Sequence, residues 1–91
     1  TQVARMAQAA GMDCTLHMSG GGLGFLYSIH YASYQSNAGP FQEYKGSSRI
    51  PFHCDTSNLQ CIDGRLRVPT GPGFGVTIDP DFIAGTKKME A

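Results

Sequence analysis

The first half of the chain alternates between helical and extended hydrophobic patterns. Residues 1–10 are almost all helix formers with their apolar positions on one face, and Gly11 follows where a C-terminal cap belongs. Residues 12–17 mix apolar and polar side chains, which predicts a short strand running into a glycine-rich loop. Residues 23–34 carry side chains at helical spacing, and residues 41–45, which follow a turn, predict a second strand.

The order helix, strand, glycine loop, helix, strand is typical of an α/β fold with a parallel sheet, whose strands are joined by helical crossovers. Two parallel strands cannot cover both of their faces, although parallel sheets are found covered on both sides. The first half therefore needs more strands than the chain supplies. Either several copies assemble into a homo-oligomer, or the missing strands belong to a longer parent chain.

The pattern changes in the second half of the chain. Residues 59–62 and 65–68 flank the pair Asp63 and Gly64, which favours the type I′ turn of an antiparallel hairpin. After a loop rich in Pro and Gly, residues 76–78 predict a short strand, and the Asp-Pro pair behind it predicts the start of a helical turn. We therefore expect an antiparallel hairpin appendage to the parallel unit.

Composition and charge exclude two classes of partner. The 91 residues include seven basic and seven acidic side chains, so no basic stripe is present to neutralise phosphates, and we expect no nucleic-acid partner. The longest apolar stretch, residues 23–34, is shorter than the roughly 20 residues that span a bilayer, so we expect no membrane partner. Charged residues make up only 15% of the chain, against about a quarter in most soluble domains. Part of the surface is therefore expected to face other protein.

Three cysteines, Cys14, Cys54 and Cys61, are odd in number and lack CxxC spacing. This usage fits reduced thiols in a cytosolic protein better than a disulfide framework, so we expect a cytoplasmic location. A pairing of Cys54 with Cys61 stays open as the alternative.

His17 stands at the carboxyl end of the first predicted strand, and Glu43 stands at the same level near the end of the second. In open α/β sheets and barrels, catalytic side chains project from this edge. Because neighbouring strands lie about 4.8 Å apart, we expect the two residues to approach each other. They would supply a base near neutral pH and a carboxyl whose charge depends on its surroundings. The alternative is structural: His17 satisfies a backbone carbonyl, and Glu43 is an exposed charge.

The loop after His17 contains Ser19, Gly20 and Gly21 and precedes a predicted helix. Its amides and the helix N-terminus would suit an anion such as a carboxylate or phosphate, which makes these three residues candidates for substrate binding. The loop has neither a Walker lysine nor complete GxGxxG spacing, so it is no specific nucleotide motif. The alternative is a flexible loop where the chain passes close to neighbouring backbone.

The remaining histidines do not predict a metal site. His30 lies in the middle of a predicted helix, where a packed, hydrogen-bonded histidine is more common than a ligand. His53, Cys54 and Asp55 are consecutive, so their side chains point in different directions, and no second cluster has ligand spacing. We assign a metal to none of them.

Three segments, in the right order, resemble the end of one known barrel domain. Residues 3–17 (VARMAQAAGMDCTLH) are similar to its sixth barrel helix and its seventh strand, which ends in the catalytic histidine. Residues 41–44 (FQEY) resemble its eighth strand with an acidic residue, and residues 68–76 resemble its closing PGxG segment. The family is the enolase superfamily, of the mandelate racemase/muconate lactonizing enzyme type.

The resemblance implies the C-terminal part of a modified (β/α)7β barrel under an α+β capping domain. Residues 1–46 would be the last barrel units, and residues 47–91 would pack with the capping domain. The superfamily uses a Lys or His base together with Mg2+ that stabilises an enediolate. His17 would be that base, or the acid in a dehydration, and Glu43 would hydrogen-bond a substrate carboxylate oxygen and stabilise the charge growing on it.

The chain departs from the family pattern in several places. Nothing in it matches the three carboxylates that hold Mg2+ on the third, fourth and fifth strands, the lysine motif of the second strand, or the aspartate of the sixth strand that orients the histidine. All of these would lie upstream of Thr1. We therefore expect the C-terminal fragment of a longer enzyme, inactive by itself, with the metal ligands outside this chain.

The glycine loop and residues 40–46 look more like the acid-sugar dehydratases of the family. The resemblance thus predicts a lyase whose parent abstracts the proton alpha to the carboxylate of a sugar acid. A racemase, an epimerase or a cycloisomerase shares the same two positions and stays open. Two further alternatives are a non-catalytic module that oligomerises through its unpaired strands and a small anion-binding domain that uses the glycine loop.

Overall fold

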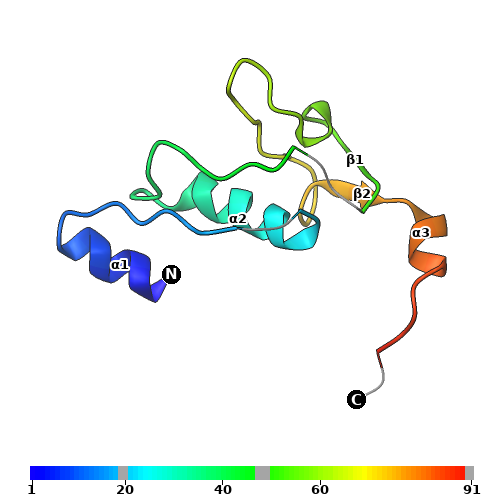
Figure 1. The fold of residues 1–91 in the computed structure, drawn as a ribbon, viewed down its shortest axis with the longest axis horizontal. Coiled ribbons are helices and arrows are strands. Elements are labelled where there is room, and N and C mark those ends of the chain that lie inside the picture. Colours follow the sequence, from blue (N-terminus) through cyan, green and yellow to red (C-terminus); the bar gives the residue numbers. More distant parts are fainter. Residues whose placement is uncertain (19–20, 47–49, 90–91) are drawn as a thin grey trace. The chain divides into compact units, whose positions relative to one another are not determined.

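The computed structural model describes residues 1–18, 21–46 and 50–89. The chain forms two compact units, Thr1–Ser47 and Ser48–Ala91. Figure 1 shows their elements in chain order, with α1 and α2 in the first unit and the short strands and α3 in the second. No helix in the described part of the chain is both long and apolar enough to cross a bilayer.

The first unit opens with α1 (Gln2–Ala9), which ends in a Schellman motif. Gly11 has a φ of 70°, and its N–H donates to the carbonyl oxygen of Gln8 at 2.9 Å. The N–H of Met12 donates to the carbonyl oxygen of Ala7, also at 2.9 Å. These bonds satisfy carbonyls that a helix end leaves unpaired. The predicted helix with a glycine cap is confirmed.

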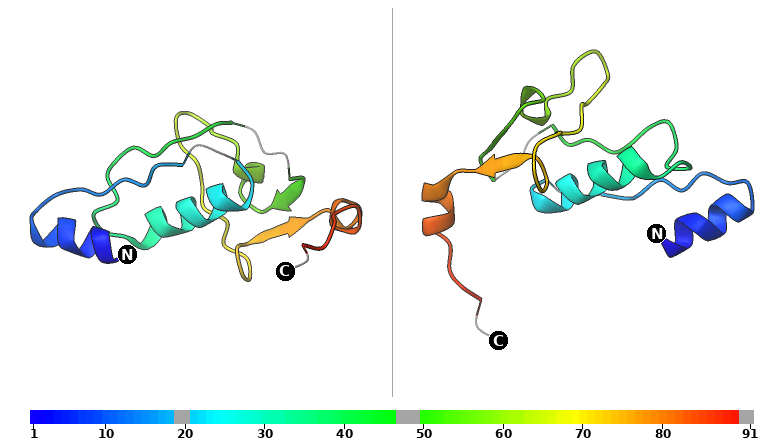
Figure 2. Two further views of the ribbon diagram at one scale, coloured as in Figure 1. Left: turned by 60° about the horizontal axis from the view of Figure 1, so that its bottom comes forward. Right: turned by 180° about the vertical axis from the view of Figure 1, so that it is seen from behind.

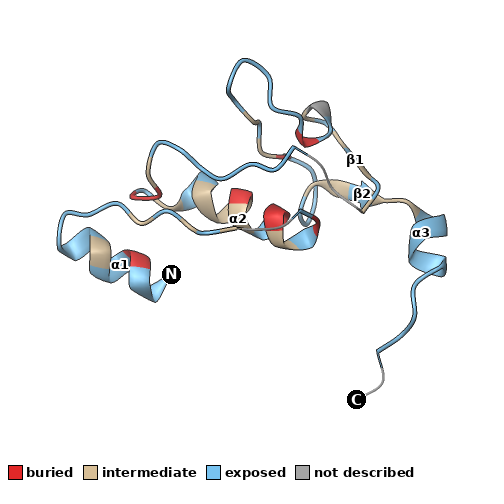
Figure 3. Ribbon diagram, in the orientation of Figure 1, coloured by how far each residue is buried: buried red, intermediate tan, exposed pale blue. Residues whose placement is uncertain are grey.

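The second helix, α2 (Leu23–Tyr34), spans the residues that the sequence predicts and supplies most of the core of the first unit. Phe25, Leu26 and Ile29 are buried on one side of it, and Leu26 is 0% exposed. Ala4 is the buried residue of α1. Figure 3 shows the buried positions in red on both helices. The core is small, because it rests on one face of α2.

The prediction of two strands is wrong, since neither residues 12–17 nor residues 41–45 are assigned to a strand. Both segments run as irregular chain beside α2, as Figures 1 and 2 show, and no ladder joins them within the described residues. The backbone N–H of Cys14 donates instead to the carbonyl oxygen of Asn37 at 2.7 Å. A strand needs a hydrogen-bonded neighbour about 4.8 Å away, and the described part of the chain offers none to either segment.

The second unit contains an antiparallel pair of strands, β1 (Phe52–Cys54) and β2 (Val76–Ile78). His53 lies opposite Thr77 in the register. The predicted strand at 76–78 is therefore confirmed. Its partner β1 is too short, at three residues, to show an alternating pattern in the sequence.

The predicted type I′ turn is confirmed, although its hairpin is shorter than the sequence predicts. Asp63 and Gly64 have φ values of 52° and 72°, both positive as that turn requires. Ile62 and Arg65 exchange backbone hydrogen bonds of 2.8 and 3.0 Å. The antiparallel pairing stops at this one bridge in the described part of the chain.

The predicted helical turn after β2 is also confirmed. It is the five-residue helix α3 (Pro80–Ala84), with Pro at its first position. The side chain of Asp79 accepts a 2.9 Å hydrogen bond from the N–H of Asp81 and so caps the helix.

Gly75 allows the chain to turn into β2. Its N–H donates to the carbonyl oxygen of Pro72 at 2.9 Å, and its φ is 73°. A Cβ at this position would lie 2.6 Å from the Cβ of Pro69 and 3.1 Å from the N of Gly71. Only glycine has both the conformation and the space for this turn. Gly73 also has a positive φ, of 61°, but a Cβ there would meet nothing within 4 Å.

This contrast predicts unequal effects of two matched substitutions. Gly73→Ala should lower the free energy of unfolding by about 1–2 kcal/mol, because the left-handed conformation is the only feature of this position that is unfavourable for alanine. Gly75→Ala should cost about 1–3 kcal/mol more, because its Cβ also overlaps Pro69. Denaturant unfolding of the two variants measures the difference. Equal losses would mean that the close contact with Pro69 does not constrain the turn.

Candidate active site

Asn37 ties the elements of the first unit together. It is buried, 8% exposed, in the turn that follows α2. Its side-chain amide donates to the carbonyl oxygens of Ala4, at 2.9 Å, and Met12, at 3.1 Å, while its Oδ1 accepts from Nε2 of Gln35 at 2.7 Å. Its own carbonyl receives the N–H of Cys14. Helix α1, the segment that follows it and the turn after α2 are therefore joined through one side chain.

The carbonyl oxygen of Ala38 accepts hydrogen bonds from both extended segments, residues 12–17 and residues 41–45. Oγ1 of Thr15 donates to it at 2.9 Å, and Nε2 of Gln42 donates to it at 2.8 Å. Gly39, with a φ of 82°, leaves room for this arrangement, since a Cβ there would lie 2.4 Å from Oγ1 of Thr15. Thr15 and Gln42 are thus held against the same peptide group, which sets the alignment of the residues that follow them.

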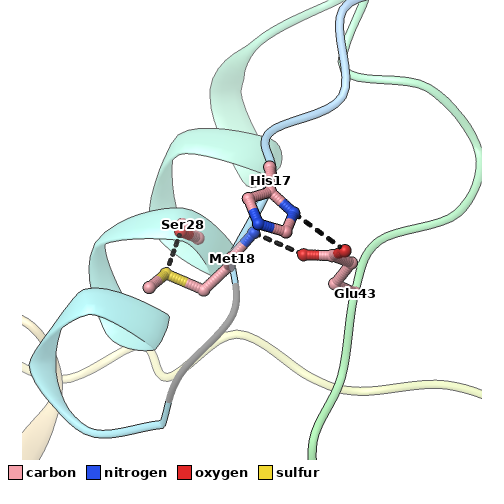
Figure 4. A network of polar contacts seen from close by, with 4 residues as sticks. All are labelled: His17, Met18, Ser28 and Glu43. Carbon is pink, nitrogen blue, oxygen red and sulfur yellow. Dashed lines mark hydrogen bonds and ion pairs between the residues drawn. The ribbon is translucent and has the colours of Figure 1, made fainter.

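Just beyond these anchors, His17 and Glu43 meet. Nδ1 of His17 lies 3.1 Å from Oε1 of Glu43, and the backbone N–H of Met18 donates to Oε2. Figure 4 shows the carboxylate facing both groups. The His17 side chain is 79% exposed and that of Glu43 is 47% exposed. One carboxylate therefore holds a histidine side chain and the backbone of the next residue in an accessible position.

Side-chain alternation explains why His17 is accessible. Cys14, Leu16 and Met18 are half-buried, whereas Thr15 and His17 are exposed. Successive side chains of an extended segment point to opposite sides, so His17 faces away from the half-buried row.

A small pocket lies beside the pair, on the side of Met18. Oγ of Ser28 is 3.3 Å from Sδ of Met18, as Figure 4 shows. Glu43 borders this pocket, whereas His17 does not. The pocket is lined by side chains from the two extended segments and from one side of α2: Leu16, Met18, Phe25, Ser28, Ile29, Gln42 and Glu43.

The surroundings of Glu43 favour its ionised form. The N–H of Met18 makes the largest contribution in lowering the pKa of Glu43 below its ordinary value of 4.5, and partial burial opposes it. The hydrogen bond and charge of His17 and the charge of Lys45 lower the pKa further. At neutral pH, Glu43 is a carboxylate and can only accept hydrogen bonds.

The expected approach of His17 and Glu43 is confirmed, while their catalytic roles stay predictions. Of the three candidate substrate-binding residues, Ser19 and Gly20 lie outside the described residues. Gly21 is exposed immediately before Gly22, the N-cap residue of α2. Among the candidates that lie in the described residues, the structure brings together His17 and Glu43.

Sequence reasoning misses the residues that hold this pair. Asn37 is recognisable as part of a turn, but no local pattern shows that its amide reaches Ala4 and Met12. The backbone N–H of Met18 is likewise invisible in a sequence, because every residue except proline carries one. The sequence signal at Asn37 is the Asn-Ala-Gly-Pro turn that it begins, and this signal does not identify hydrogen-bond partners.

The described residues contain no cluster of three or more His, Cys, Asp or Glu side chains that could hold a metal ion. Asp55, next to His53 and Cys54, is already engaged: Thr70 donates to its carboxylate through both its hydroxyl and its N–H, which lowers the pKa of Asp55. Cys14, Cys54 and Cys61 are reduced and form no disulfide. The described part of the chain therefore does not fit a Mg2+ site.

The contacts of Glu43 predict its titration. A 13C-detected pH titration should give a pKa below 4.5 for Glu43, and His17→Ala should raise it only part of the way, because the N–H of Met18 still donates. The contacts of the Glu43 carboxylate add stability that is fully present above the pKa of Glu43 in the unfolded chain. This stability is lost as the pH falls through the lower pKa of Glu43 in the folded protein. His53→Ala is the matched control and should leave the titration unchanged. A normal pKa in the wild-type protein would contradict the geometry.

The comparison with known families identifies the family of the chain. The model of the enolase C-terminal domain-like family matches residues 1–82, which is most of the chain. No curated protein sequence and no solved structure matches the chain. The matched range includes His17, Glu43 and the turn around Gly75. The chain belongs to the enolase C-terminal domain-like family, of the mandelate racemase/muconate lactonizing enzyme type.

Proposed function

We propose that this chain supplies the acid–base histidine of an enolase-superfamily enzyme that removes the proton alpha to a carboxylate. The observation that supports this most directly is the contact between Nδ1 of His17 and Oε1 of Glu43, 3.1 Å, at an exposed position. A histidine exchanges protons near neutral pH, and a neighbouring carboxylate fixes its orientation. Family membership supports the reaction class, and the contact supports the choice of residues.

The substrate that we propose is a sugar acid, and the reaction is a dehydration. His17 takes the proton from the carbon next to the substrate carboxylate, and the electron pair of that bond moves toward the carboxylate. An imidazolium formed in this way can then give its proton to a departing hydroxide, so one side chain serves both steps. The similarity of residues 40–46 and of the glycine loop to acid-sugar dehydratases supports this choice over racemisation, epimerisation or cycloisomerisation.

We propose further that the complete active site needs residues beyond those described. Enzymes of this superfamily generally use Mg2+ to stabilise an enediolate, and the described residues bring no three metal-ligating side chains together. Additional strands of a (β/α)7β barrel would pair with residues 12–17 and 41–45 and carry those ligands. The 91-residue chain alone would accordingly be inactive.

A second candidate is a non-catalytic module that forms homo-oligomers. The observation that favours it is exposed apolar surface in the first unit: Val3 and Met6 on α1 are largely exposed, and Phe41 is 84% exposed. Side chains of this kind are suited to contacts with other protein. The same surface would also be covered by further barrel strands, so a functional test of His17 separates the two candidates.

The test is the exchange of the alpha proton with solvent deuterium, followed by NMR in the enzyme that contains this chain. With Mg2+ and a panel of sugar acids, His17→Asn should slow exchange by about 10²–10⁴-fold, because Asn cannot take up a proton near pH 7. Exchange isolates the abstraction step that dehydratases, racemases and epimerases share.

His53→Asn serves as the control, since His53 lies in β1 of the other unit. It should exchange at the wild-type rate. If His17→Asn also exchanges at that rate, His17 is not the proton-exchanging residue, and the non-catalytic candidate is favoured.

A further inference from the structure

The second unit contains an open cleft that the function proposed above does not use. Its volume is about 430 Å³, within the range of roughly 300–1,000 Å³ that is usual for small-molecule sites. The cleft is lined by residues of the loop 55–60 and of the short hairpin 62–67. Both segments belong to Ser48–Ala91. The cleft is therefore formed within one unit.

Two arginines, Arg65 and Arg67, line this cleft together. Both are exposed, and Leu66 between them is half-buried. Successive side chains of an extended segment point to opposite sides, so the two arginines lie on the same side of the hairpin. Among the described residues, neither guanidinium group takes part in an ion pair. The cleft thus presents two cationic groups whose N–H donors are available to a ligand.

The acidic residues of the cleft do not neutralise these two cations. Both oxygens of Asp55 accept hydrogen bonds from Thr70, one from its N–H at 3.3 Å and one from its hydroxyl. Asp63 lies in the turn of the hairpin and forms no ion pair within the described part of the chain. An anion that enters the cleft therefore meets unpaired guanidinium groups, and the carboxylate of Asp63 opposes it.

The loop and the hairpin are held in place before any ligand binds. The hydroxyl of Thr56 donates to the carbonyl oxygen of Arg67 at 3.0 Å and so joins the two segments. The N–H of Cys54 donates to Oδ1 of Asn58 at 2.9 Å. Asn58 and Leu59 have φ values of 49° and 60°. Two consecutive side-chain-bearing residues in the left-handed region are unfavourable, and backbone of this kind is common at ligand sites. Fixed segments also lose little freedom when a ligand binds.

The pair of arginines favours a phosphate group over a carboxylate. One guanidinium group can satisfy both oxygens of a carboxylate through two parallel hydrogen bonds. A phosphate monoester has three terminal oxygens and nearly two negative charges at about pH 7, so it can accept from two guanidinium groups at once. Two arginines do not form the long basic surface that nucleic acid requires. The ligand that fits the cleft is therefore small.

We propose that this cleft binds a phosphate group, either free or carried by a small molecule, and that Arg65 and Arg67 hold it. Gln60 also lines the cleft, and its amide can donate to a further phosphate oxygen. Thr56 acts as a positioning residue, because it holds the backbone of Arg67. The site does not depend on the proton transfer proposed for His17.

An NMR titration of the 15N-labelled protein tests the site with three probes: inorganic phosphate, glycerol 3-phosphate and succinate. Both phosphates should cause saturable shifts of the backbone amide signals of residues 55–67, with a Kd of about 1 mM or lower. Succinate also carries two negative charges at about pH 7.5, but it places them on separate carboxylates. It should bind at least about 10-fold more weakly than glycerol 3-phosphate.

The two phosphate probes distinguish the sources of the ligand. Tighter binding of glycerol 3-phosphate would assign the site to a phosphorylated molecule, whereas equal binding of both probes would assign it to free phosphate. Either result supports a phosphate site, because the same two arginines make the contacts.

Substitutions of the charged residues identify the groups that bind. Arg65→Gln and Arg67→Gln should each weaken phosphate binding about 10-fold or more, because each removes charge-assisted hydrogen bonds from an exposed side chain. Arg67→Lys should also weaken it, since an ammonium group cannot bind an oxyanion through a planar fork. Asp63→Asn should strengthen it, because the opposing carboxylate is lost and Asn tolerates the left-handed conformation of this turn.

Arg5→Gln is the matched control, since Arg5 is an exposed arginine in α1 of the other unit. It should bind phosphate as the wild-type protein does. Unchanged affinity in Arg65→Gln and Arg67→Gln, or succinate binding as tight as that of glycerol 3-phosphate, would overturn the proposal. A failure of the exchange test on His17 would leave these results unaffected, so the two proposals are judged separately.

Discussion

The amide of Asn37 is the constraint on which the first unit depends. Its two donated hydrogen bonds join the carbonyls of Ala4 and Met12, which belong to α1 and to the chain that leaves it. A buried amide left without such partners would cost about 1–3 kcal/mol. The small core lies on one face of α2, and the hydrogen bonds of Asn37 join the chain segments beside it.

The position of the His17–Glu43 pair follows from that connection. The turn that contains Asn37 presents the carbonyl of Ala38 to Thr15 and Gln42, and the next side chains along the two segments are close enough to meet. Glu43 then accepts from His17 and from the backbone of Met18. Fixed acceptors and donors of this kind need no rearrangement when a proton moves, which is how preorganised sites assist proton transfer.

The local features of the fold can be predicted from the sequence. The glycine cap at Gly11, the helix at 23–34 and the turn at Asp63 and Gly64 each depend on neighbouring residues only, and each is present. The strands at 12–17 and 41–45 depend on hydrogen bonds to other strands, which an apolar pattern cannot supply. Their prediction fails for that reason.

The candidate site was predictable in part. Matched positions in two adjacent segments bring His17 and Glu43 together even without a sheet, because side chains, and not a backbone ladder, fix the alignment. The ionisation of Glu43 depends on the Met18 N–H, whose direction only a three-dimensional structure shows. The resemblance to the enolase superfamily points to the two residues, and the hydrogen bonds show how they contact each other.

The pKa of Glu43 in an Asn37→Ala protein tests the central claim that Asn37 aligns the pair. Measured by NMR on protein whose helix content is unchanged by circular dichroism, it should rise toward 4.5, although Glu43, His17 and Met18 are intact. Gln8→Ala is the control, since Gln8 joins α1 to the same turn through an exposed 2.8 Å bond to Ser36 and should leave the pKa low. A pKa that stays low in the Asn37→Ala protein would contradict the account.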